Sequence, residues 1–210
     1  MDNAKVLEML EEERIDELKD MLQDEIYKDS IRSTPNANKR YAAMKRYFKY
    51  TDNARECLQK PYAYDYNGVK YNSFTNSWSL VLTKESTGEI EMFEGNYPDI
   101  SRLIRFDGIK KKIDFNDVIA KAKSKGYRRT KGEVGPGFKY LMHYDGTYYK
   151  VGLIDISYEI INDGEPSITY HPDGERMPLT IENDIGISII MPVFIHDKEA
   201  LEEKVVIEID

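Results

Sequence analysis

Residues 92–104 read MFEGNYPDISRLI and mark a joint between two parts of this 210-residue chain. Glu91 and Phe93 alternate with their neighbours as residues of a strand do, and Gly95-Asn96 is a turn signal. Pro98 fixes the backbone and lacks the N–H group that a strand ladder requires. A lysine-rich segment with helical spacing begins a few residues later. The stretch therefore predicts the end of one structural module and the start of another.

The length and composition are those of a folded protein with one large domain or two small ones. Hydrophobic residues make up 40% of the chain and charged residues 32%, which allows a packed core. The chain has no run of 18 apolar residues, so we expect no membrane span. The N-terminus leads into an acidic segment, which is not the pattern of a signal peptide. The single cysteine, Cys57, excludes an internal disulfide and suits a reducing, cytoplasmic compartment.

The formal net charge of −8 is unevenly distributed along the sequence. Residues 1–29 are strongly acidic, and apolar residues recur among them at helical spacing, so we expect an acidic helical extension over 1–34. One interpretation is a packing helix with a solvated acidic face. The other is an arm that binds a basic partner or covers a DNA-binding face.

Two basic segments contrast with this acidic background. The first predicts a helix over 39–50, and the second predicts a helix from an N-cap at Asp114 to a C-cap at Gly126. In the second helix the buried stripe is expected to be Phe115, Val118, Ile119 and Ala122. The cations suited to contact phosphates are Lys39, Arg40, Lys45, Arg46, Lys49, Lys121, Lys125, Arg128 and Arg129. An ordinary solvated helix face is the alternative interpretation.

Both parts of the chain place a basic helix before a series of strands. In the first part, alternating tyrosines in 62–66 and the hairpin turn Asn67-Gly68 predict a meander of strands. In the second part we expect strands near 138–143 and 147–151 and further strands within 168–194, whereas the apolar run 153–161 fits a helix or a strand. The tail ends in an alternating pattern that predicts an edge strand. The expected divisions are 1–34, 35–104, 105–196 and 197–210.

Three local matches, in this order, resemble bacterial DNA sliding clamps, the processivity factors of DNA polymerases. The first is Gly95–Ile104, at the joint between modules. The second is 112–122, which is similar to the first helix of a clamp module. The third comprises 176–181 and 187–193, which are similar to the last strands of a clamp, where a proline-bearing strand precedes a Met-Pro-Val type of ending. Together the matches fall within residues 92–193.

The chain also departs from the clamp pattern. It has room for two short modules where bacterial clamps have three, and Arg105 stands where the family usually has proline. Residues 1–29 and the tail after Val193 have no counterpart. A subunit with two modules would need three copies to complete a ring of six.

The resemblance implies an α+β fold with two DNA-clamp-like modules, each a helix plus an antiparallel sheet. It implies a non-enzymatic protein that binds DNA without sequence preference, tethers a polymerase or another replication partner, and forms a homo-oligomer. A phage origin is one option for such a divergent form. The resemblance also implies a groove for a partner peptide near Met177, Pro178, Met191, Pro192 and Val193. The alternative interpretation of these five is that they are core residues of strands.

Two other classes of function remain open. Tyr62, Tyr64, Tyr66 and Tyr71 could stack the bases of single-stranded nucleic acid, although cross-strand packing is the commoner role of such a ladder. The protein could instead be a structural or regulatory interaction module whose acidic N-terminal segment binds a partner. The oligomeric state discriminates among these classes, because a ring of copies favours the clamp and a monomer favours the others.

No motif for catalysis stands out. His143, His171 and His196 lack the spacing of metal ligands, and Cys57 is expected to be a small packing residue. The segment Gly132–Gly137 lacks the Lys-Ser/Thr pair of a phosphate-binding loop, so we expect a flexible loop there. We therefore expect neither an enzyme nor a metal or cofactor site.

Overall fold

The computed structural model describes residues 14–15, 37–50, 55–85, 87–88, 90–172, 177–195 and 198–209. The chain divides into two compact units, residues 1–38 and 39–210. The acidic extension expected over 1–34 lies outside the described residues, apart from Arg14 and Ile15, and so do Arg176 and His196. The elements discussed below lie in the second unit, and the first of them, a helix, begins two residues before that unit, at Ala37.

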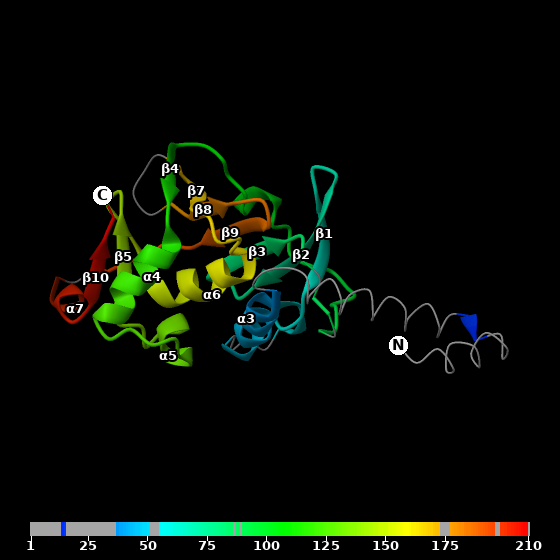
Figure 1. Ribbon diagram of the computed structural model, residues 1–210, viewed down its shortest axis with the longest axis horizontal. Helices are drawn as coiled ribbons and strands as arrows, with labels where there is room; N and C mark the ends of the chain where they lie inside the picture. Colours follow the sequence, from blue (N-terminus) through cyan, green and yellow to red (C-terminus); the bar gives the residue numbers. More distant parts are fainter. Residues whose placement is uncertain are drawn as a thin grey trace. The chain divides into compact units, whose positions relative to one another are not determined.

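Seven strands form one antiparallel sheet that takes strands from both sides of the joint (Figure 1). In spatial order they are β1 (Tyr62–Tyr66), β2 (Val69–Thr75), β3 (Ser79–Thr83), β9 (Gly186–Ile190), β8 (Leu179–Glu182), β7 (Ser167–His171) and β4 (Ile109–Ile113). β3 and β9, far apart in the chain, pair near the middle with Leu82 opposite Ile187. The chain is therefore of mixed α and β structure with one large antiparallel sheet, and the two-module clamp-like arrangement stays a prediction.

The hairpin turn between β1 and β2 forms as predicted. Asn67 and Gly68 both have positive φ angles, 53° and 78°. This is the requirement of a type I′ turn, which is why asparagine and glycine occupy the two positions. Tyr66 and Val69 pair directly across the turn.

Two segments differ from the sequence-based expectation. The run Lys110–Lys112 was expected to open the basic helical segment, but it lies in the strand β4, which pairs with β7 from Ile109 to Ile113. Its side chains alternate in exposure, with Lys110 and Lys112 exposed and Lys111 half-buried. Lysines on an edge strand are a common protection against unwanted pairing. The alternation near Glu91 and Phe93 gives no strand in the described residues 90–100. Here the backbone forms isolated contacts instead, such as the 2.7 Å hydrogen bond from Phe93 N to Pro61 O.

A smaller sheet combines the C-terminal tail with a hairpin. Its order is β10 (Val205–Glu208), β5 (Tyr140–Tyr144) and β6 (Thr147–Lys150). β10 is an edge strand, as the tail predicted, and runs parallel to β5 with Ile207 opposite Met142. Ile207 is 2% exposed, so the tail contributes to the core.

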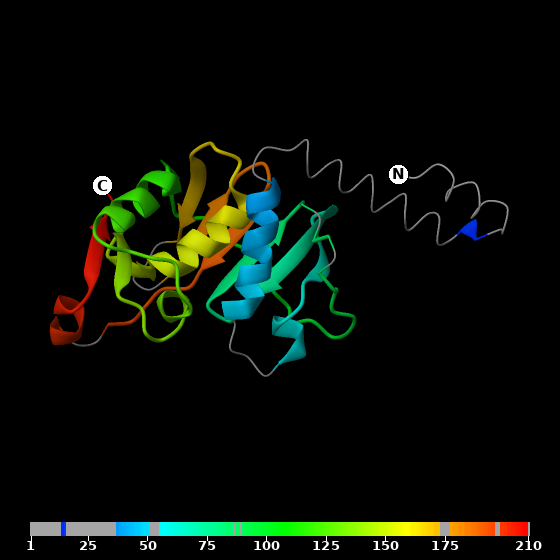
Figure 2. The same cartoon turned by 60° about the horizontal axis from the view of Figure 1, so that its bottom comes forward.

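The described residues contain five α-helices, and α6 is the most central of them. These are α3 (Ala37–Tyr50), α4 (Phe115–Ser124), α5 (Lys131–Val134), α6 (Val151–Ile161) and α7 (Lys198–Glu202); Glu56–Leu58 and Ser101–Leu103 form 3-10 turns. Every residue of α6 except Glu159 is buried, which settles the ambiguous apolar run as a helix. Figure 2 shows α6 (yellow) between α4 (green) and α3 (blue) on one face of the large sheet. Among the described helices none combines the length and apolar character that crossing a membrane would require.

α4 forms with the ends and the buried stripe that the sequence predicts. The side chain of Asp114 caps the helix by accepting a hydrogen bond from Asn116 N at 2.9 Å. Gly126 follows the helix with a φ of +96°, a conformation that glycine adopts at little cost. Phe115, Val118, Ile119 and Ala122 are all buried.

The two faces of the large sheet bury different clusters. Because strand residues alternate in direction, Val81 and Ile190 point to the helices, whereas Leu80 and Ile189 point to the opposite face. That opposite face is covered by Ile100 and Ile104 and by partly buried tyrosines. The joint stretch therefore serves as a cover for the sheet, which explains its apolar residues.

The buried Tyr158 and the partly buried Tyr97 should make this fold sensitive to alkaline pH. Burial raises the pKa of Tyr97 and that of Tyr158 to about 12, from an ordinary value of 10.0. Between these two pKa values the folded protein keeps phenol protons that the unfolded chain has released. This contribution to stability is therefore complete below the ordinary pKa and is lost as the pH rises through the pKa of the folded protein. We expect Tyr97→Phe to remove up to about 3 kcal/mol of that loss, since one pKa unit corresponds to about 1.4 kcal/mol.

Urea unfolding of both proteins across the alkaline range measures this effect. Tyr97→Phe also removes the 3.0 Å contact between the Tyr97 hydroxyl and Ser73 Oγ. That loss lowers stability at every pH, so the pH slope is the informative quantity. An identical slope in the two proteins would show that Tyr97 does not hold its proton through burial.

Candidate nucleic-acid interface

α3 presents cations on one side and anchors itself on the other. Its exposed cations are Lys39, Lys45, Arg46 and Lys49. On the opposite side Met44 and Tyr47 are buried, and the Tyr47 hydroxyl donates a 2.8 Å hydrogen bond to Ser79 O in β3. The helical period thus separates a charged face from a packing face.

Arg40 does not belong to this exposed set, contrary to the sequence-based expectation. It is 2% exposed, and its Nη1 donates to Asn162 O at 3.0 Å, just beyond the end of α6. Its Nη2 lies 3.4 Å from a carboxylate oxygen of Glu85. The guanidinium therefore links α3 to the end of α6 and to Glu85, which follows β3. The Glu85 carboxylate neutralises its charge.

The second predicted group of cations lies on α4 and the segment after it. Lys121, Lys125 and Arg128 are exposed. Lys121 Nζ lies 2.9 Å from Asp117 Oδ2, one helical turn away, and Lys125 Nζ donates to Val206 O at 3.1 Å. These contacts are at the surface, where an ion pair contributes little and exchanges readily for another anion.

Arg129 is the second correction among the predicted phosphate contacts. Its guanidinium forms ion pairs with Asp155 and Glu159 of α6, and its Nε donates to Asp155 Oδ2 at 2.6 Å. The Tyr127 hydroxyl donates to the same oxygen at 2.8 Å. Asp155 is 2% exposed, so a buried carboxylate needs these donors. Arg129 is therefore an internal counter-ion and not a surface cation.

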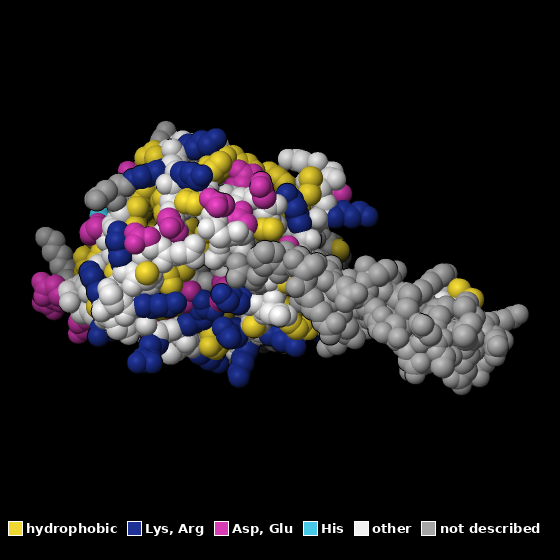
Figure 3. Space-filling model, viewed as in Figure 1, with side chains coloured by type: hydrophobic (Ala, Val, Ile, Leu, Met, Phe, Trp, Pro, Cys, Tyr) yellow, Lys and Arg dark blue, Asp and Glu magenta, His cyan; other side chains and the backbone are white. Residues whose placement is uncertain are grey.

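The remaining predicted cations share the helix-bearing side of the sheet but form two groups. α3 carries one group, α4 and the following segment carry the other, and α6 lies between the two helices (Figure 2). Figure 3 shows Lys and Arg side chains gathered over α3 and α5, in the lower part of that view. The exposed cations of this area, with Lys131 on α5, give a positively charged surface on an acidic protein.

The structure brings the five predicted partner-binding residues together at one end of the β8–β9 pair. Leu179 pairs with Ile190, so Met177 and Pro178 before β8 lie close to Met191, Pro192 and Val193 after β9. Pro192 is buried and the other four are half-buried. The backbone of this segment is held by Met191 N donating to Trp78 O at 2.9 Å and Val193 N donating to Tyr148 O at 2.8 Å. The five residues are thus grouped at one end of this strand pair, and four of them are partly exposed.

The tyrosines considered for base stacking are used for packing. Tyr64, Tyr66 and Tyr71 pack against the cluster that contains Leu80 and Leu82. Tyr62 stacks on Tyr97 with ring centroids 4.4 Å apart. All four ladder tyrosines are half-buried, which agrees with the interpretation of cross-strand packing.

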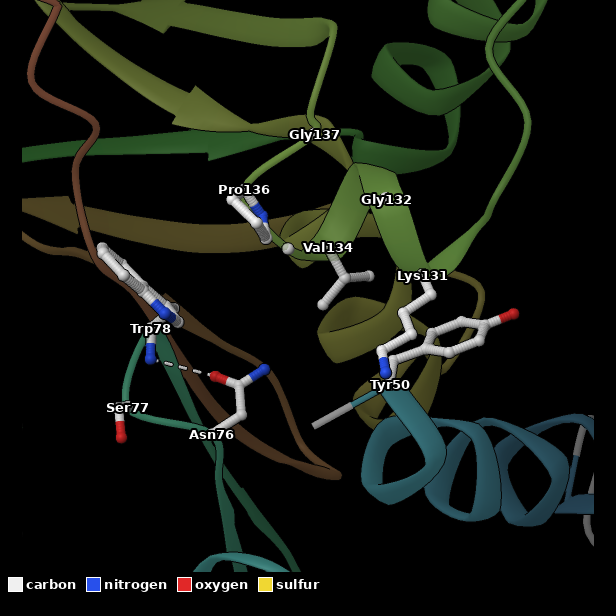
Figure 4. Close-up of a pocket in the computed structure, with 10 residues that line it drawn as sticks. Tyr50, Asn76, Ser77, Trp78, Lys131, Gly132, Val134, Pro136 and Gly137 are labelled. Atoms are coloured by element: carbon white, nitrogen blue, oxygen red, sulfur yellow. Dashed lines mark hydrogen bonds between the residues drawn. The ribbon is translucent and has the colours of Figure 1, made fainter. Parts of the chain in front are cut away.

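A cavity of about 480 Å³ opens beside α3, and sequence reasoning did not find it. Its walls come from Tyr50 at the end of α3, the turn Asn76–Trp78 between β2 and β3, and α5 with the loop to Gly137 (Figure 4). Trp78 is 52% exposed, the most exposed of the large hydrophobic side chains in the described residues. The one signal in the sequence was a lone tryptophan after Asn76-Ser77, a polar turn between two strands.

The glycine-rich segment forms part of this cavity in a defined conformation. It was expected to be a flexible loop, but its start is the short helix α5, capped by Thr130. α5 packs so closely on α6 that a Cβ atom added at Gly152 would lie only 2.5 Å from Glu133 O. Gly152 therefore allows the backbone contact that fixes this wall.

Lys150 supports the cavity wall from inside the protein. It is 4% exposed, and its Nζ donates to Gly135 O at 2.9 Å. The same ammonium lies 4.7 Å from the centroid of the Trp78 ring and 4.7 Å from that of Phe138. Burial, together with the nearby charge of Lys204, lowers the Lys150 pKa.

Cys57 and the described histidines, which were considered for catalysis or metal binding, lie in different elements of the fold. Cys57 is half-buried in the 3-10 turn Glu56–Leu58. His143 Nδ1, on the middle strand of the small sheet, lies 2.7 Å from Glu208 Oε2 on β10, whereas His171 is fully buried in the large sheet. In the part of the chain that the structure describes, no three His, Cys, Asp or Glu side chains are grouped as metal ligands would be.

Comparison of the chain with models of protein families, with curated protein sequences and with solved structures gave no match. The resemblance to sliding clamps therefore stays a prediction. Three features of the described residues are suited to binding. They are the positively charged surface, the partly exposed apolar residues at the end of β8–β9, and the cavity beside Trp78.

The different roles of two neighbouring arginines can be tested by stability. Arg129→Ala leaves the Asp155 carboxylate buried without a counter-ion, so we expect a loss of about 3–5 kcal/mol in the free energy of unfolding. Arg128→Ala changes an exposed side chain and should alter that free energy by less than about 0.5 kcal/mol. Chemical denaturation of the two variants measures both values. Equal stability of the variants would mean that Arg129 is not an essential counter-ion.

Proposed function

We propose that this protein binds DNA through its phosphate backbone, without reading bases, and tethers a replication partner to it, in the manner of a sliding clamp. The observation that carries the proposal is the set of exposed cations on the helix-bearing side of a chain with a net charge of −8. The set comprises Lys39, Lys45, Arg46, Lys49, Lys121, Lys125 and Arg128. Arg40 and Arg129 are left out, because both are committed to internal partners.

The kind of cation supports contact with the backbone in preference to bases. Five of the seven positions lie on the helices α3 and α4, and Lys125 caps the C-terminal end of α4. Five of the seven side chains are lysines, whose flexible ammonium groups bind phosphate as point charges. Contacts of this kind position a protein on nucleic acid but carry no sequence information. A protein that has to move along DNA needs this property.

Open sheet edges support assembly of several copies. Among the described strands, β1 and β4 are the two ends of the large sheet, and each pairs on one side only. An edge strand offers unpaired backbone groups to a second copy. Because the lysines of β4 disfavour such pairing, copies join through β1 in this proposal, with their cationic helices facing a common DNA.

Charge neutralisation tests the DNA-binding half of the proposal. For the wild type, the logarithm of duplex affinity should fall linearly with the logarithm of salt concentration. The triple variant Lys45→Gln, Arg46→Gln, Lys49→Gln should reduce the magnitude of that slope by about 2–3, roughly one per lost phosphate contact. Fluorescence anisotropy with a labelled duplex measures affinity at each salt concentration.

A control variant changes the net charge by the same amount elsewhere. Lys84, Arg102 and Arg105 are exposed cations beside Leu82 and Ile104, which pack on the face of the sheet opposite the helices. Their replacement by Gln should leave the slope nearly unchanged. Equal slopes for the two triple variants, or salt-independent binding by the wild type, would refute a phosphate-binding surface on α3.

The partner surface is proposed to be the apolar group at the end of β8–β9. Met191→Ala should weaken binding of a short apolar replication peptide by about tenfold, the equivalent of 1.4 kcal/mol, because it removes part of a half-buried contact surface. Met92→Ala, at a half-buried methionine elsewhere, is the control. Truncation after Phe194 is unsuitable, because it would remove the buried Ile207 of β10. Peptide titration in which Met191→Ala and Met92→Ala behave alike would exclude this surface.

A further inference from the structure

The exposed side chain of Trp78 is presented by a turn whose backbone is fixed. Asn76 Oδ1 accepts a hydrogen bond from Trp78 N at 3.0 Å (Figure 4) and another from Ser79 N at 2.8 Å. Ser77 between them has a φ of 72°, which a non-glycine residue adopts only where its surroundings hold it. Met191 N binds the carbonyl of Trp78 at 2.9 Å. A large apolar side chain is thus held in place without being covered.

Among the described residues, the charged groups around the indole ring are cations, and no carboxylate lines the cavity. The buried ammonium of Lys150 lies 4.7 Å from the ring centroid, in the range of a cation–π contact. Lys131 lines the cavity, and the ten residues that line it, all described, include no Asp or Glu. In Figure 4 Lys131 comes from α5 and Tyr50 from the end of α3, across the cavity from Trp78. The cavity therefore suits a ligand that combines an aromatic ring with negative charge.

The position of the cavity points to one source of such a ligand. It lies between the end of α3 and α5, and these are the elements over which Lys and Arg side chains gather in Figure 3. A nucleic-acid strand on that surface would bring its bases to the cavity. Its volume of about 480 Å³ lies within the range of small-ligand pockets. A paired base is enclosed in its stack, so only an unpaired base could enter.

We propose that this cavity binds an unpaired base of single-stranded nucleic acid, with Trp78 as the stacking platform and Lys131 near the adjoining phosphate. The inference rests on the proposed phosphate-binding surface, because the cations of α3 would hold the rest of the strand. Stacking on an aromatic side chain tolerates any base, since every base has a π face. A protein of this kind would bind a duplex through its cations and hold an adjacent unpaired nucleotide at Trp78.

The chain supplies its own reporter for this site, because Trp78 is its only tryptophan. Intrinsic fluorescence of the full-length protein is followed during titration with three probes: a short oligothymidylate, an abasic strand with the same number of phosphates, and a duplex. We expect saturable quenching by the oligothymidylate and little quenching by the other two. Equal quenching by the abasic strand would overturn the proposal, and so would stronger quenching by a phenylalanine-containing peptide.

Substitutions give an independent readout by anisotropy of a labelled strand. Trp78→Ala should weaken binding of the oligothymidylate by about tenfold or more and leave duplex binding unchanged. Trp78→Phe, which keeps an aromatic face, should lie between Trp78→Ala and wild type. Phe194→Ala is the matched control, because Phe194 is an exposed aromatic residue outside the cavity lining. Circular dichroism and thermal unfolding confirm that each variant is folded.

The outcomes separate this inference from the proposed function. If duplex binding follows salt as expected but Trp78→Ala binds oligothymidylate as tightly as wild type, the base site is wrong and the phosphate surface stands. If the oligothymidylate quenches Trp78 and the Lys45, Arg46, Lys49 variant keeps the wild-type salt slope, the base site stands and the proposed surface is wrong.

Discussion

Burial of α6 is the constraint on which the rest of the structure depends. All its residues except Glu159 are buried, and it packs on β3 and β9 of the large sheet as well as on α4 and α5. β3 precedes the joint and β9 lies near the C-terminal end, so one helix holds both parts of the chain to one sheet. A helix that is apolar on nearly all sides is stable only when covered all round. The positions of α4 and α5 therefore follow from the need to cover the apolar side chains of α6.

The same constraint explains why two predicted surface arginines are internal. α6 carries one buried carboxylate, Asp155, and Arg129 and Tyr127 supply the donors that it requires. Just beyond the end of α6, Arg40 binds the carbonyl of Asn162. A cation in a basic run is therefore available to a ligand only if the core has no need of it. The exposed cations around these two arginines form the surface that the proposed function uses.

The functional features lie at the margins of the packed elements. The cavity occurs where α3 ends, where β2 turns into β3 and where α5 meets α6 at Gly152. The half-buried Met177 and Met191 lie at one end of β8–β9, and the backbone of Met191 binds that of Trp78. The proposed base site and the proposed partner surface are thus joined by a backbone hydrogen bond.

The sequence by itself determined the local elements whose signals are strong. The cap at Asp114, the glycine at 126, the Asn67-Gly68 turn and the apolar stripe of α4 all formed as predicted, because each depends on residues within a few positions. Only the tertiary structure decided that Lys110–Lys112 forms a strand, because pairing with β7 overrides local spacing. It also decided which cations are exposed, since Arg40 and Arg129 meet partners from distant segments. Trp78 became a candidate for the same reason: its cavity is made by three segments that the fold alone brings together.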